Sequence, residues 1–91
     1  MRLAELAKQL IAAPTDAARR RLLAHHPRLA NEGLADEIRL ACYSAWNVNP
    51  AEAQKAARAI NCLAKFKDSE GITATALWVR GVSKITQARF Q

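Results

Sequence analysis

Apolar residues recur at helical spacing along most of the chain. Within residues 2–13, Leu3, Leu6, Leu10 and Ile11 mark one face of an amphipathic helix. Similar patterns predict four further helices, over about 16–26, 32–47, 50–66 and 70–91. The pattern of hydrophobic positions therefore describes a chain of five helices joined by short breaks.

The breaks contain residues that start or stop helices for stereochemical reasons. Thr15 or Asp16 can cap the second helix with a side-chain oxygen, and Pro27 stops it because the residue before a proline avoids the helical region. Asn49 is a good N-cap, and Pro50 suits the first position of a helix. The start of the fourth helix is therefore the best-marked boundary.

The fifth helix carries the largest apolar side chains of the second half of the chain. Its predicted inward stripe consists of Ala74, Leu77, Trp78, Gly81, Val82 and Ile85. A glycine inside a helix costs about 1 kcal/mol relative to alanine. We therefore expect Gly81 to mark a place where a neighbouring helix comes very close.

Composition supports an all-α fold. The 91 residues are 51% hydrophobic, with only 3 Gly and 3 Pro, and are rich in alanine, the best helix former. We expect one helical domain: a hairpin over 1–30, a helix pair over 31–67, and the first helix of a further repeat over 68–91. Because the last residues carry no stop signal, we expect this array to be truncated at its C-terminus.

The beginning of the chain does not read as a signal peptide, since Glu5 and Lys8 interrupt its apolar pattern. No stretch approaches the roughly 20 apolar residues needed to cross a bilayer. These features predict a cytoplasmic protein without membrane contact.

The chain is basic, with a net charge of +6 and a pI near 10.0. Most basic residues are scattered, and Arg19, Arg20 and Arg21 form the main run, which we expect to point mostly outward on the second helix. A solvated cationic surface is the simpler interpretation. The alternative is a small nucleic-acid-binding domain that contacts phosphates through these three arginines and Arg28.

No pattern of reactive side chains indicates an enzyme. Cys42 and Cys62 lack zinc-ligand spacing, and both fall on apolar helix faces, so we expect buried, reduced thiols. His25 and His26 diverge at a helix end and cannot chelate one ion together. The three glycines are isolated and form no phosphate-binding loop. We therefore expect no catalytic residue, metal or cofactor.

Residues 77–91 resemble the first helix of a tetratricopeptide repeat. In that family a large apolar residue stands four positions before a small one, and an aromatic residue stands nine positions after it. Leu77, Gly81 and Phe90 occupy these places, whereas Arg80 and Lys84 depart from the family's leucine and tyrosine. The degenerate resemblance covers about residues 35–91 and implies antiparallel hairpins stacked in a right-handed array.

The leading segment carries a second resemblance. Its short second helix and the turn His26-Pro27-Arg28-Leu29 are similar to the opening of some bacterial tetratricopeptide proteins that are joined to a caspase-like domain. No protease residues are present in this chain. A closed bundle whose first helix packs against its fifth is the structural alternative.

The repeat resemblance implies a non-enzymatic scaffold that binds a peptide or partner helix in a groove between helices. The positive charge favours an acidic partner. The predicted partner-binding residues are Trp78, Leu77, Val82, Ile85, Arg80, Lys84, Tyr43 and Asn47. Self-association through an uncovered fifth helix is a further expectation.

Overall fold

The computed structural model describes residues 2–46 and 48–90, with side chains as far as Gly81. The fold is all-α, as predicted. The helices are α1 (Leu3–Ala12), α2 (Asp16–His25), α3 (Glu32–Ala45), α4 (Pro50–Phe66) and α5 (Glu70–Phe90), with a short 3-10 helix, η1 (Pro27–Leu29), after α2. The predicted helices are confirmed, although η1 was not foreseen and α3 ends slightly earlier than expected.

Side-chain caps fix where four of the helices begin. Thr15, Asn31, Asn49 and Ser69 each accept a hydrogen bond from the backbone N–H three residues later, at 3.2, 3.0, 3.4 and 3.5 Å. Such caps satisfy donors that have no partner inside the helix. Interactions within one helical turn therefore define these boundaries.

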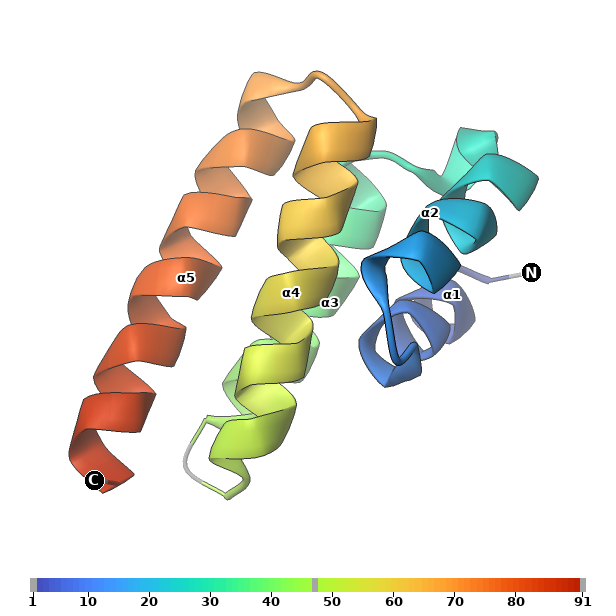
Figure 1. The fold of residues 1–91 in the computed structure, drawn as a ribbon. Helices are drawn as coiled ribbons and strands as arrows, with labels where there is room; N and C mark the ends of the chain where they lie inside the picture. The colour runs from blue at the N-terminus through green and yellow to red at the C-terminus, as the bar shows by residue number, and fades with distance from the viewer. Residues whose placement is uncertain (1, 47, 91) are drawn as a thin grey trace.

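The helices are arranged in layers around α4. Helices α3, α4 and α5 run antiparallel side by side, and the α1–α2 hairpin lies on the side of α3 and α4 opposite to α5 (Figure 1). Helix α5 packs against α4 and α3, whereas α1 packs mainly against α3 and α4. Within the described residues no extensive contact joins α1 to α5, so the closed-bundle alternative is wrong.

Small side chains allow α4 to contact all four other helices. Ala53, Ala56, Ala57 and Ala59 are buried on it, next to larger residues such as Ile60. Alanine occupies little space, so neighbouring backbones approach α4 from several directions. The large core side chains around it come from every α-helix: Leu6, Leu10, Leu23, Leu34, Ile38, Ile60, Leu63, Ile72 and Val79.

The two cysteines lie in this core as free thiols, which confirms the prediction of buried, reduced residues. Burial raises the pKa of the Cys42 thiol, because a thiolate loses hydration there. Burial also raises the pKa of Cys62, and the negative charge of Asp16 adds to that effect. Both thiols therefore behave as small apolar side chains.

Arg19 is the exception to the expectation that the three consecutive arginines point mostly outward. Its side chain is only 4% exposed and donates three hydrogen bonds. Nε reaches the carbonyl of Leu10 at 2.8 Å, one Nη reaches the carbonyl of Ala13 at 2.9 Å, and the other reaches the Asp16 carboxylate at 2.7 Å. Arg19 therefore ties the end of α1 to the beginning of α2.

The inward stripe predicted for α5 is also wrong as far as Gly81, and its last members, Val82 and Ile85, lie outside the described side chains. Among the α5 side chains that the structure describes, the buried ones are Ile72, Ala76 and Val79, which form a different face from the one that carries Leu77. Gly81 is exposed, and a Cβ atom added there would meet nothing within 4 Å. The expected close approach of another helix at Gly81 is therefore not found in this fold.

No helix among the described residues combines the length and the apolar character that crossing a membrane requires.

Candidate functional site

An aromatic pair occupies the groove between α3 and α5. The rings of Tyr43 and Trp78 lie 4.6 Å apart between centroids, with an interplanar angle of 51°. The guanidinium carbon of Arg39 stands 5.6 Å from the centre of the Tyr43 ring. Together with Ala74 and Thr75, these side chains line a hollow of about 250 Å³, which we call the aromatic groove.

Helical spacing positions these groups. Arg39 and Tyr43 are four residues apart on α3, and Ala74 and Trp78 are four residues apart on α5, so each pair shares one helix face. The contact between the two aromatic rings joins the helices at the surface rather than in the core. Tyr43 remains 40% exposed and Trp78 39% exposed.

Further apolar surface lies near the aromatic groove. Leu40 on α3 is 51% exposed, and Leu77 on α5 is 60% exposed. Leu40 stands three residues before Tyr43 on α3, so it shares a helix face with that ring. Leu77 precedes Trp78 on α5 and lines a different hollow, on the other flank of the helix.

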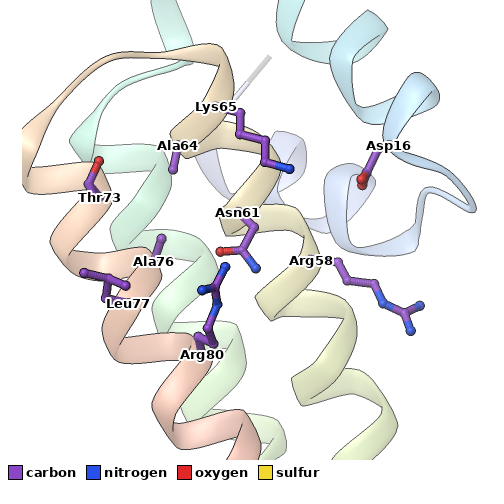
Figure 2. Close-up of a pocket in the computed structure, with 9 residues that line it drawn as sticks. All are labelled: Asp16, Arg58, Asn61, Ala64, Lys65, Thr73, Ala76, Leu77 and Arg80. Carbon is purple, nitrogen blue, oxygen red and sulfur yellow. The ribbon is translucent and has the colours of Figure 1, made fainter.

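A second hollow lies on the other flank of α5, over the outer face of α4. Its volume is about 390 Å³, and we call it the basic trough. Its lining residues are Asp16, Arg58, Asn61, Ala64, Lys65, Thr73, Ala76, Leu77 and Arg80. Figure 2 shows Arg80 reaching from α5 toward Asn61, whereas Arg58 and Lys65 extend over the side of α4 that faces α2.

The basic trough lies in the strongly charged part of the chain. Residues 53–91 contain seven basic residues and two acidic ones, a net charge of +5, whereas residues 1–52 contain seven basic and six acidic residues, a net charge of +1. Among the described residues the ion pairs are Arg19–Asp16, Arg39–Asp36 and Lys55–Glu52. The three basic side chains of the trough belong to none of these pairs.

The structure brings together only some of the predicted partner-binding residues. Tyr43 and Trp78 meet in the aromatic groove, and Leu77 and Arg80 line the basic trough. The other four fall outside the described residues or side chains: Asn47, Val82, Lys84 and Ile85. Sequence reasoning thus named both flanks of α5 without separating them.

Three residues of these sites were missed by the sequence reasoning. Arg39 carried a usable signal, since it stands one helical turn before Tyr43, where a cation meets an aromatic ring. Arg58 and Lys65 share a helix face with Asn61 at spacings of three and four. That polar face lines the basic trough only because α5 packs beside α4.

The arginines proposed for phosphate binding do not act as one surface. Arg20, Arg21 and Arg28 are exposed, but Arg19 is held inside by its hydrogen bonds to the protein. Arg19 therefore does not share the exposed surface of the other three arginines, and the nucleic-acid alternative stays a prediction. His25 and Arg28 help line another shallow hollow of about 440 Å³, around η1. In the described part of the chain, no three His, Cys, Asp or Glu residues are grouped to hold a metal.

No protein-family model matches the chain, and no curated protein or solved structure is significantly similar to it. The resemblances to tetratricopeptide and caspase-linked proteins therefore stay predictions. The candidate site is defined by its physical character alone: an aromatic groove and a basic trough on the two flanks of one helix.

Proposed function

We propose that this chain is a non-enzymatic interaction module that binds a helix or peptide segment of a partner protein along α5. The observation that supports this most strongly is the half-exposed pair of Tyr43 and Trp78 in the aromatic groove. Aromatic side chains held in place on a rigid surface are the residues that most often dominate binding energy at protein interfaces.

The outward face of α5 has the pattern of a helix-packing surface. Ala74, Leu77, Trp78 and Gly81 follow the spacing that places residues on one side of a helix, and the fold does not bury them. The small residues at the two ends of this stripe leave room for another backbone, and the large ones provide contact area. An apolar stripe without a covering element inside its own fold is suited to a partner.

The expected contribution of Trp78 follows from its exposed area. A fully covered aromatic side chain buries about 150–250 Å². With 39% of Trp78 exposed, a partner can cover roughly 60–100 Å² more of it. At about 25 cal/mol per Å², this burial contributes roughly 1.5–2.5 kcal/mol, or about a tenfold to seventyfold change in affinity.

A peptide-display selection against the whole chain tests the proposal. We expect selected peptides to carry apolar residues at helical spacing and to bind Trp78→Ala at least about tenfold more weakly. Val48→Ala is the matched control, because Val48 is also an exposed apolar residue but lines neither the aromatic groove nor the basic trough. Selection of no specific peptide, or of peptides that bind Trp78→Ala normally, would refute the proposal.

The same surface of α5 could instead bind a second copy of this chain. A second copy would bring two chains of net charge +6 together, which opposes association at low salt. Light scattering after size exclusion separates the two cases. A dimer that Trp78→Ala converts to a monomer would identify the partner as another copy of this chain and would overturn binding to a separate protein.

A further inference from the structure

We infer that the basic trough receives the carboxylates of an acidic peptide segment, and that this segment belongs to the partner bound along α5. This inference rests on the proposed function, because it names the chemistry of the partner for the same helix. The observations behind it are the charge, the spacing and the mixed lining of the trough.

The trough presents positive charge that the protein itself does not neutralise. Arg58, Lys65 and Arg80 line it, and none of them belongs to an ion pair among the described residues. Asp16 at the rim is the single acidic lining residue, and it accepts a hydrogen bond from Arg19 at 2.7 Å. An incoming anion therefore meets a positive field with little internal competition.

The spacing of the trough suits several anionic groups in a row. Arg58 and Lys65 are seven residues apart on α4, which corresponds to roughly 10 Å along a helix at about 1.5 Å per residue. Asn61 lies between them, and Arg80 faces it from α5 (Figure 2). Glutamates one or two turns apart on a peptide helix match this length, whereas a single small anion would use only part of it.

The lining favours a peptide over a nucleic acid. Leu77 forms part of the trough wall and is largely exposed, so it offers contact to an aliphatic side chain. Proteins that bind single-stranded nucleic acid without sequence preference stack bases on aromatic side chains. The trough lining contains no aromatic residue, and the exposed aromatic pair lies in the other groove.

One peptide can reach both sites. Leu77 and Trp78 are consecutive on α5, and they point to the trough and to the aromatic groove respectively. A segment that lies along α5 therefore contacts Trp78 with its apolar residues while its carboxylates face Arg80 and Lys65. The apolar and the charged residues of the partner therefore contribute to the binding free energy at two different places on α5.

The test uses a displayed peptide that binds the full chain, together with a copy in which every Glu and Asp is replaced by Gln or Asn. Binding is measured by calorimetry at low and at physiological salt. We expect the amide copy to bind about tenfold more weakly, and the natural peptide to lose a similar factor in the double variant Arg80→Gln/Lys65→Gln. The matched control is Lys8→Gln/Arg28→Gln, which removes two exposed charges elsewhere and should retain at least about half of the binding.

Three other outcomes overturn the inference. If Trp78→Ala abolishes binding but the trough variant and the amide copy do not change it, the proposed function stands and the role of the trough fails. If neither Trp78→Ala nor the trough variant matters, both fail. If a single-stranded oligonucleotide binds more tightly than the peptide and loses that binding in the trough variant, the trough is a nucleic-acid site instead.

Discussion

The buried Arg19 offers the sharpest prediction about stability. Pro14 has no N–H, so it cannot donate the helical hydrogen bond that the carbonyl of Leu10 would otherwise receive. The Nε atom of Arg19 donates to that carbonyl instead, at 2.8 Å, and an Nη atom donates to Ala13 at 2.9 Å. Arg19→Met keeps an unbranched side chain out to the position of Nε but leaves both carbonyls without this donor.

The expected cost follows from these two bonds. A hydrogen bond from a charged group contributes about 1.5–3 kcal/mol, so the joint loss of the two bonds should lower the free energy of unfolding by about 3–6 kcal/mol. The third bond adds little, because its partner Asp16 is exposed to solvent. Since small domains unfold with about 5–15 kcal/mol, the variant should be clearly less stable.

Chemical denaturation followed by circular dichroism measures this loss. Arg20→Met and Arg21→Met are the matched controls, since both side chains are exposed, and each should change the free energy of unfolding by less than about 0.5 kcal/mol. We expect Arg19→Lys to fall between the wild type and Arg19→Met, because one ammonium cannot replace the forked donors. Equal stability of Arg19→Met and Arg20→Met would refute this assignment of the bonds.

Three further substitutions test packing and ionisation. Gly81→Ala should raise the stability by up to about 1 kcal/mol in thermal unfolding, because a Cβ there meets no neighbour and alanine favours the helix; a loss would mean that something covers Gly81. Leu63→Ala should lower the free energy of unfolding by about 2–5 kcal/mol in denaturant unfolding, whereas Leu77→Ala on the exposed face should lower it by less than about 0.5 kcal/mol. Equal losses in the two variants would contradict the observed core. The raised pKa of Cys42 means that the folded protein holds the thiol proton more tightly than the unfolded chain does. This contribution is complete below the ordinary value of 9.0 and is lost as the pH rises beyond it, so Cys42→Ala should unfold with a weaker dependence on pH in the alkaline range, and an unchanged dependence would count against this interpretation.

Much of the fold was predictable because the relevant signals are local. Thr15, Asn49 and Pro50 start helices through interactions within one turn, and the structure uses them as the sequence suggests. The apolar spacing of the first helix also identified Leu6, Leu10 and Ile11, which are buried in the structure. These features depend on neighbours in the chain and not on distant packing.

The face of α5 could not be chosen from spacing alone. Two apolar stripes overlap on this helix: one contains Ile72 and Val79, and the other contains Leu77 and Trp78. Size favoured the second stripe, but the contacts with α4 and α3 bury the first. Packing against the neighbouring helices decides which stripe faces inward. That packing cannot be derived from the spacing of residues within α5.

The candidate site was predictable only in part for the same reason. Trp78 and Tyr43 were both predicted as partner-binding residues, but their contact joins helices far apart in the chain. The burial of Arg19 had a signal in Pro14, since a proline just after a helix leaves a carbonyl without its usual donor. Pro14 therefore shows that the Leu10 carbonyl needs another hydrogen-bond donor, but it does not show that Arg19 is that donor.

The most direct test of partner binding along α5 uses the two tryptophan side chains as internal probes. Trp46 and Trp78 are the chain's two tryptophans, so a nitrogen–proton correlation spectrum contains two indole signals, which Trp78→Phe assigns. The Trp46 indole N–H is buried, whereas Trp78 is half-exposed beside Tyr43. On addition of a selected peptide we expect the Trp78 signal to shift with the affinity of the complex while the Trp46 signal stays in place. A bound peptide that leaves the Trp78 signal unchanged, and shifts backbone signals around η1 instead, would contradict the proposal.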